Sequence, residues 1–345
     1  MSEPQKVRWG ILGCAGIAER AFIPAVLESR SGVLAGIASR DEARAAGWAR
    51  RFGFPKFHRS YEDLVADPEI DAVYNPLPND LHAEWSIRAL RAGRHVLCEK
   101  PMALDAAEVR AMIEAAEANG VRLMEGFMYK FHPQMAKTLE LLRAGTIGEP
   151  RAVHSAFTFR FQRDPGNYRW SPEHGGGALY DVGCYTISVA RLVLGAEPFA
   201  ATAAARVDAA TGVDLTTEAL LEFPGGRFAQ CEASFEAQFQ SRLLIVGSEG
   251  ALHLARAFSA KDFDVAVEIV RGDAAESVPV PKADMFTAMV DDFGAAVLGL
   301  TALRYPASDA WLNMRAIDAC FESIRTGSRV LIREPVPPTG GMPCV

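Results

Sequence analysis

The sequence has little lysine and no excess of basic residues. Only seven residues are lysines, and lysine and arginine together number 36 against 43 aspartate and glutamate residues, for a formal net charge of -7. Nucleic-acid binding normally requires a basic surface, so this acidic balance argues against it. We therefore expect a small-molecule partner and no nucleic acid.

Cysteine is also scarce, and long hydrophobic runs are missing. The six cysteines form no Cys-x-x-Cys pair and none of the cysteine and histidine spacings typical of zinc sites. This pattern predicts reduced thiols, a cytoplasmic location and no metal. No apolar stretch reaches the roughly 18 residues that a membrane span needs, and residues 1–6 lack the basic and apolar regions of a signal peptide. We expect no membrane association.

The first part of the chain predicts a doubly wound α/β domain. At about 100–200 residues per domain, the 345 residues indicate two domains. Short apolar runs at 7–12, 33–38, 72–75, 95–98 and 121–124 alternate with helical patterns at 17–29, 41–51, 80–91 and 105–118. This alternation is typical of βαβ units and a parallel sheet of the Rossmann type. We place a dinucleotide-binding domain at 1–125.

The remaining chain has a different pattern. Alternating apolar residues at 152–161, and strand-like runs at 215–223, 227–237 and 243–246, predict an open, mostly antiparallel sheet. Helical patterns follow at 178–194, after three glycines, and at 285–298 and 308–325. We expect an α+β domain at 126–335 for substrate binding and oligomer contacts, and a poorly ordered proline-rich tail at 336–345.

A glycine-containing turn follows the first strand. The segment Gly10-Ile-Leu-Gly13-Cys-Ala15-Gly16-Ile17-Ala18 fits the G-x-G-x-x-G/A fingerprint at Gly13 and Ala18, with Ala15 in place of the middle glycine. The alternative is an ordinary turn between strand and helix. Because the turn begins a run of βαβ units, we expect Gly13, Ala15, Gly16 and Ile17 to bind a dinucleotide.

The end of the second strand indicates which dinucleotide. An NAD site usually has a carboxylate there to bind the ribose hydroxyls, but this strand ends in Ser39-Arg40. A hydroxyl and a guanidinium favour a 2′-phosphate, so we predict NADP rather than NAD. In the alternative interpretation, Arg40 only flanks a helix that begins at Asp41.

Two further segments lie at the carboxyl ends of predicted strands, where parallel sheets bind ligands. They are Asn75-Pro-Leu77-Pro78-Asn79-Asp-Leu-His82 and Cys98-Glu99-Lys100-Pro101. Fixed by the following proline, Lys100 could place its ammonium near a substrate oxygen. From position alone, it could equally be a surface lysine in a turn.

Together these segments resemble a known family. Glu99-Lys100-Pro101, the string at 71–82, Met124-Glu-Gly-Phe-Met-Tyr-Lys-Phe-His-Pro-Gln134 and Gly175-Gly-Gly-Ala-Leu-Tyr-Asp181-Val-Gly-Cys-Tyr185 are similar to segments of the Gfo/Idh/MocA oxidoreductases. That family is grouped with glucose-fructose oxidoreductase and inositol dehydrogenase. The most similar branch contains NADP-dependent D-xylose dehydrogenase and dimeric dihydrodiol dehydrogenase.

The resemblance implies a set of site residues. It assigns catalysis to Lys100, Asp181 and Tyr185, and it places Leu77, Pro78, Asn79 and His82 beside the nicotinamide, with Glu99 and Lys100 also at the cofactor. Four residues apart on a helix, Asp181 and Tyr185 share one face. A tyrosine has a pKa near 10, and a cation such as Lys100 favours its phenolate. Tyr185 would then take the hydroxyl proton in oxidation and return it in reduction, while Asp181 orients the substrate or holds the lysine.

A polar and aromatic segment precedes the three glycines. Its candidate substrate contacts are Arg160, Phe161, Tyr168, Arg169 and Trp170, with Asp164 among them. Aromatic faces and charged groups of this kind could line a sugar pocket. The segment could equally be a loop or a sheet edge.

These patterns predict an NADP-dependent oxidoreductase that transfers a hydride between the cofactor and a sugar. The first choice is an aldose 1-dehydrogenase similar to D-xylose dehydrogenase, and the alternatives are a trans-dihydrodiol dehydrogenase or a keto-sugar reductase acting on a cyclic diol or sugar. A noncatalytic NADP(H)-sensing regulator should have lost Lys100, Asp181 and Tyr185, and all three are present. An open sheet with an uncovered apolar face predicts a homodimer or larger homo-oligomer.

Overall fold

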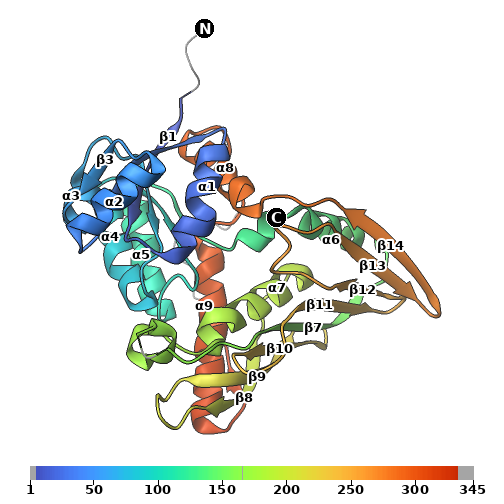
Figure 1. Ribbon diagram of the computed structural model, residues 1–345. Helices are drawn as coiled ribbons and strands as arrows, with labels where there is room; N and C mark the ends of the chain where they lie inside the picture. The colour runs from blue at the N-terminus through green and yellow to red at the C-terminus, as the bar shows by residue number, and fades with distance from the viewer. Residues whose placement is uncertain (1–4, 165, 333–345) are drawn as a thin grey trace.

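The structure, a computed structural model, describes residues 5–164 and 166–332. It contains two separate β-sheets, each packed with helices (Figure 1). The tail predicted at 336–345 lies outside the described residues. The predicted fold class is confirmed: a parallel sheet with helices is followed by a mostly antiparallel sheet with helices.

The first sheet is parallel and has the strand order expected of a doubly wound domain. Its order is β3 (Lys56–His58), β2 (Gly32–Ala38), β1 (Val7–Leu12), β4 (Ala72–Asn75), β5 (His95–Cys98) and β6 (Leu123–Glu125). The connecting helices are α1 (Ile23–Glu28), α2 (Glu42–Phe52), α3 (Tyr61–Ala66), α4 (His82–Arg91) and α5 (Ala106–Ala118). Strands β2 and β3 are added on one side of β1, and β4 to β6 on the other. The carboxyl ends of β1 and β4 therefore flank the point where the strand order changes side, which is the position where such sheets bind nucleotides.

Local sequence explains where several of these helices begin. The side chains of Asp41, Ser60 and Asp105 each accept a hydrogen bond from the backbone N–H three residues later, at the start of α2, α3 and α5. The helical patterns predicted from 41 and 105 therefore begin close to their expected positions. Strand β3 and helix α3 had not been predicted, because three and six residues are too few for a period to be visible.

The second sheet has nine strands and one parallel pair. Its order is β14 (Ala274–Val280), β13 (Val265–Arg271), β12 (Ala251–Leu254), β11 (Gln240–Gly247), β7 (Pro150–Thr158), β10 (Arg227–Ser234), β9 (Asp214–Phe223), β8 (Ala200–Val207) and β15 (Val330–Leu331). Every pair is antiparallel except β7 with β10. Helices α6 (Pro133–Arg143), α7 (Cys184–Leu194) and α9 (Ala307–Thr326) contact the sheet from one side (Figure 1).

The most apolar helical segment is part of the core. Among the described residues, Pro172–Leu194 is the one helical stretch long and apolar enough to cross a membrane by length and composition, and 89% of its apolar window is buried in the protein. Its α7 portion packs on β7, β10 and α9. Burial between a sheet and a helix accounts for this apolar character.

The two halves of the chain are interlocked. Helix α8 (Met285–Val297), late in the sequence, packs against α1, and Phe293 lies 5.5 Å from the ring of Trp9 on β1. A buried ion cluster joins α7 to α9: Arg191 binds Asp309 at 3.0 Å, and Lys130 binds the same carboxylate. This arrangement fixes the helix that carries the candidate catalytic residues.

Candidate active site

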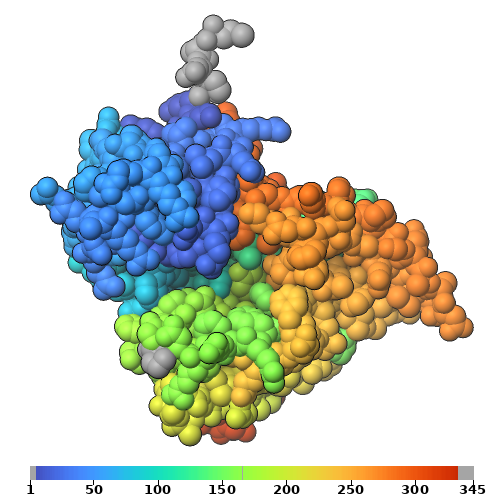
Figure 2. Space-filling model, in the orientation of Figure 1, coloured from blue at the N-terminus to red at the C-terminus, as the bar shows by residue number. Residues whose placement is uncertain are grey.

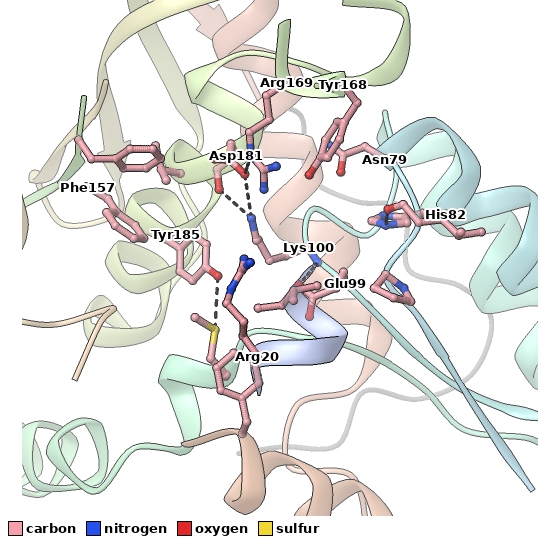
Figure 3. A pocket seen from close by; sticks show the side chains of 17 residues that line it. Arg20, Asn79, His82, Glu99, Lys100, Phe157, Tyr168, Arg169, Asp181 and Tyr185 are labelled. Carbon is pink, nitrogen blue, oxygen red and sulfur yellow. Dashed lines mark hydrogen bonds and ion pairs between the residues drawn. The ribbon is translucent and has the colours of Figure 1, made fainter. Parts of the chain in front are cut away.

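A cavity of about 220 Å³ lies where the two domains meet. Figure 2 shows a hollow between the N-terminal domain and the rest of the chain, and Figure 3 shows the side chains around the cavity. One wall comes from the carboxyl ends of β4 and β5, and the other from β7 and from η6 (Leu179–Gly183), the turn of helix that leads into α7. Segments distant in sequence therefore meet at the edge where parallel sheets bind ligands.

Lys100 and Asp181 meet across this cavity. The Lys100 Nζ donates to the Asp181 backbone carbonyl at 2.9 Å and to its carboxylate Oδ1 at 3.2 Å. The same Oδ1 accepts Arg169 Nε at 2.9 Å. Burial alone would raise the pKa of the Asp181 carboxyl, but Lys100 and Arg169 outweigh it and lower this pKa to about 2. Asp181 is therefore charged at neutral pH and keeps Lys100 protonated.

Tyr185 is surrounded by other aromatic rings. Its ring centroid lies 5.1 Å from that of Phe127 and 5.3 Å from that of Phe157, and its hydroxyl contacts Met128 Sδ at 3.3 Å. Burial raises the pKa of this phenol well above its usual value, although Lys100, 5.2 Å from the ring centroid, acts in the opposite direction. Lys100 lowers the pKa of Tyr185, as expected, but burial raises it by more. Tyr185 is therefore a proton donor at neutral pH.

The Glu99 side chain lines the cavity and is held by a buried tyrosine. Its Oε1 accepts the hydroxyl of Tyr74 at 2.6 Å, and Tyr74 is fully buried with its ring stacked on Phe22. Burial raises the pKa of the Glu99 carboxyl. The Glu99 side chain is thus fixed at the point where β5 ends and the backbone turns toward Lys100.

His82 and Asn79 connect the surrounding loops. The ring nitrogens of His82 lie 2.8 Å from the carbonyl oxygens of Leu77 and Pro101. Burial lowers the pKa of His82 to about 4, although the two carbonyl oxygens favour the protonated ring. Asn79 Nδ2 donates to the Gly175 carbonyl at 2.8 Å and links the first domain to the second. Both side chains position loops of the cavity wall.

The glycine turn has the geometry that its residues predict. Gly13 has a φ of +80°, a left-handed conformation that favours glycine, and its N–H donates to the Ala38 carbonyl at 2.8 Å. A Cβ on Gly13 would lie 3.0 Å from Leu77 Cδ2. The chain is helical from residue 16 to residue 28, so its first amides face the carboxyl edge of the sheet.

The end of β2 presents cations near this turn. Ser39 is buried and Arg40 is exposed, and Arg44 Nη2 donates to the Cys14 carbonyl at 2.8 Å. The nearby carboxylate of Asp41 accepts the Arg44 N–H as the N-cap of α2. A hydroxyl and two guanidiniums therefore lie near the turn, where they could bind a phosphate. Arg44 had not been predicted.

The structure brings many, but not all, of the predicted residues to the cavity. Those that line it are Ile17, Leu77, Asn79, His82, Glu99, Lys100, Tyr168, Arg169, Asp181 and Tyr185. Those outside its lining are Gly13, Ala15, Gly16, Ser39, Arg40, Pro78, Arg160, Phe161 and Trp170. Phe161 and Trp170 stack on each other at 5.8 Å and pack with Phe235, which places both rings in a separate apolar cluster. Their substrate contact remains a prediction.

Several lining residues had not been predicted. They are Arg20, Pro76, Met128, Phe157, Phe159, Val182 and Phe286. Arg20 is four residues beyond Gly16, a helical spacing that places it on the same face as the turn, so a signal for it existed. The aromatic residues come from β7, from the residue just after it and from α8. Only the tertiary fold places them here.

A buried carboxylate lies behind the loop that carries Lys100. Glu125, at the end of β6, accepts the Met102 N–H at 2.8 Å through Oε1, whereas its buried Oε2 has no hydrogen-bond partner among the described residues. Burial raises the pKa of Glu125 to about 7 despite the opposing effect of Lys130. The carboxyl group that positions this loop therefore titrates near neutral pH.

Comparisons with known proteins agree with this arrangement. Residues 7–127 match the model described as oxidoreductase family, NAD-binding Rossmann fold, and residues 135–253 match the GFO/IDH/MocA C-terminal domain. The chain is 39% identical to D-xylose 1-dehydrogenase (NADP(+)) 2 of Haloferax volcanii, over 93% of this chain and 98% of that protein. It is 33% identical to trans-1,2-dihydrobenzene-1,2-diol dehydrogenase of Mus musculus, over 79% and 80%. Among solved structures, the 3-ketoreductase KijD10 of Actinomadura kijaniata, in complex with NADP and TDP-benzene, superimposes with a TM-score of 0.88 at 35% identity, covering 92% of this chain and 98% of that one.

The titration of Glu125 predicts a pH dependence of stability. The unfolded chain releases this proton near 4.5 and the folded chain near 7, so the free energy of unfolding falls as pH rises between these values. The fall is at most roughly 3 kcal/mol at 1.36 kcal/mol per pKa unit. Glu125→Gln keeps an oxygen for the Met102 N–H and removes the titration, so we expect a flatter profile in urea unfolding from pH 4 to pH 8.

Glu114→Gln is the matched control, because Glu114 is an exposed carboxylate on α5. This control should keep the wild-type pH profile. If the profiles of Glu125→Gln and wild type coincide, the assignment of this titration to Glu125 is wrong.

Proposed function

Because the chain belongs to the Gfo/Idh/MocA family of oxidoreductases, we propose that it transfers a hydride between NADP(H) and a sugar. The first reaction to test is aldose 1-dehydrogenation of the D-xylose dehydrogenase type. The observation that carries this proposal is the meeting of Lys100, Asp181 and Tyr185, from two domains, in one cavity at the carboxyl edge of the parallel sheet.

The residues present fit an NADP cofactor. The left-handed turn at Gly13 leaves room for close backbone approach, and Ser39, Arg40 and Arg44 offer donors to a 2′-phosphate. At the end of β2, where an NAD site would have a carboxylate, this chain has Ser39 and Arg40. The carboxylate of the next residue, Asp41, caps helix α2. When bound, NADP(H) supplies or accepts the hydride.

The chain's own residues handle the substrate oxygen and its proton. Lys100, kept charged by Asp181, presents an ammonium that can bind the reacting oxygen and stabilise negative charge on it. Tyr185 donates a proton to that oxygen in reduction and takes it back in oxidation. Its neighbours Phe127 and Phe157 pack against the ring and hold it in position.

Keto-sugar reduction is the second candidate. The specific observation that favours it is the raised pKa of Tyr185, which supplies a protonated phenol at neutral pH. A dihydrodiol remains a further alternative substrate. The rings of Phe157, Phe159 and Tyr168, with the cation of Arg169, support a pocket for the CH faces and hydroxyls of a sugar or related cyclic diol.

We also propose that the protein is a cytoplasmic homodimer or larger homo-oligomer. The five cysteines within the described residues are free and buried, as suits a reducing compartment. Helices α6, α7 and α9 contact one side of the second sheet, and Leu220 and Phe228 are exposed on the neighbouring strands β9 and β10. A second copy would cover these side chains.

Tyr185→Phe tests the catalytic assignment. Purified protein with NADP or NADPH is assayed at 340 nm against aldoses, inositols, cyclic diols and keto-sugars. We expect wild-type turnover with an aldose or keto-sugar, and a loss of about 10²- to 10⁴-fold in the variant, because the proton donor is removed. Tyr305→Phe, in a tyrosine outside the cavity lining, is the control and should retain turnover.

Two outcomes would contradict this proposal. Near wild-type turnover by Tyr185→Phe with the cofactor bound would exclude Tyr185 as the acid and base. NADPH binding without turnover on the whole panel would favour the sensing regulator instead.

Arg40→Ala tests the preference for NADP. Loss of a hydrogen bond to a charged phosphate should lower the ratio of kcat/KM for NADP over NAD by about ten- to a hundredfold. Arg50→Ala, an exposed arginine on α2, should leave the ratio unchanged. A wild-type preference for NAD would refute the interpretation of Ser39 and Arg40.

Sedimentation velocity tests the assembly. We expect a dimer or larger species at micromolar concentration, because burial of the open sheet face removes apolar surface from water. Phe228→Asp should shift the distribution toward monomer. A wild-type monomer at this concentration contradicts the proposal.

A further inference from the structure

Arg20 is a cavity residue that the proposed reaction does not use. It lies in η1 (Ala18–Phe22), the helical segment after the glycine turn, and its side chain lines the cavity. Figure 3 shows that it points inward, toward the end of the cavity occupied by Lys100 and Tyr185. A guanidinium in this position needs a chemical explanation, since its charge is always present.

Arg20 has no carboxylate partner within residues 5–164 and 166–332. The adjacent carboxylate, Glu19, binds Arg51 at 2.6 Å. The two acidic groups of the cavity are also engaged, since Asp181 binds Lys100 and Arg169, and Glu99 accepts the Tyr74 hydroxyl. The guanidinium is therefore free to bind an anion that comes from outside the chain.

The charges of the cavity point the same way. Lys100 and Arg169 share the single charge of Asp181, and Arg20 adds a further positive charge that is paired with no carboxylate in the described part of the chain. Burial raises the pKa of Glu99 and thus opposes the negative charge on that carboxyl. Like charges in a partly closed cavity repel each other more strongly than they do in water, so the cavity favours an anionic ligand.

The position of Arg20 indicates where the anion lies. A Cβ on Gly16 would be only 2.8 Å from Arg20 Nη1, so the guanidinium is packed directly beside the glycine turn. The same turn presents the first helical amides, which favour phosphate oxygens. Two kinds of donor, the side-chain fork of Arg20 and the backbone amides, therefore lie close together beside the glycine turn.

We propose that Arg20 binds the diphosphate of the dinucleotide and is its principal side-chain anchor. This inference depends on the proposed function, because it assumes that the cofactor is a dinucleotide. Arg20 neutralises charge on the diphosphate, which the backbone amides of the turn also bind. The alternative ligand of Arg20 is a phosphate or carboxylate group on the substrate. The experiment distinguishes this group from the cofactor diphosphate.

The test is a fluorescence titration of the full-length protein with NADPH, which does not depend on turnover. Arg20→Gln should raise the Kd for NADPH about ten- to a hundredfold, the loss expected for a hydrogen bond between charged groups. It should also reduce the slope of log Kd against log salt concentration. Arg20→Lys keeps the charge without the fork and should recover part of the affinity.

Arg91→Gln is the matched control, because it removes the same charge from an exposed position on α4. Its Kd should equal the wild-type value. Circular dichroism verifies that each variant is folded, and Arg20→Lys keeps the test decisive if Arg20→Gln fails to fold. Inorganic pyrophosphate should compete with NADPH for wild-type protein and compete less well for the Arg20 variants.

The outcomes distinguish this inference from the proposed function. If wild-type protein does not bind NADPH, the proposed cofactor is wrong. If wild-type protein binds NADPH and Arg20→Gln binds it equally well, the cofactor stands and the role of Arg20 is refuted. Unchanged NADPH binding, with turnover lost only on sugar acids or sugar phosphates, would assign Arg20 to an anionic substrate and overturn the proposal.

Discussion

The Asp181 carboxylate is the charge on which the site depends. It is buried, and it binds Lys100 from one domain and Arg169 from the loop that precedes its own helix. Removal of one partner from a buried ion pair typically costs about 3–5 kcal/mol, because the remaining charge loses its compensation. Here two cations share one carboxylate, so the position and charge of the reactive ammonium follow from this single group.

The aromatic surroundings of Tyr185 set the second property of the site. Rings from β7 and from the loop after β6 bury the phenol, and burial determines the direction in which its pKa moves. The cation of Lys100 acts against this shift without reversing it. Apolar packing therefore dominates the pKa of the proton donor, and a carboxylate keeps the ammonium charged.

Sequence was informative where the determinants are local. The glycine turn at Gly13 and the Glu-Lys-Pro segment at Lys100 could be predicted because each follows a strand whose apolar run is visible. The helical spacing from Gly16 could have placed Arg20 beside this turn, but the roles of Arg20 and Glu125 depend on what the fold places opposite them. The parallel pairing of β7 with β10 likewise joins segments more than 70 residues apart, and no local pattern encodes it. Short elements such as β3 contain too few residues for a period.

The bond between Lys100 and Asp181 also crosses the boundary between the two halves of the molecule, as does the hydrogen bond from Asn79 to Gly175. The reactive ammonium acquires its counter-ion only when the halves are seated against each other. Any movement that separates the two halves at this point breaks this ion pair. Separated halves would retain the ion pair of Asp181 with Arg169, but they would leave the reactive ammonium of Lys100 without its counter-ion.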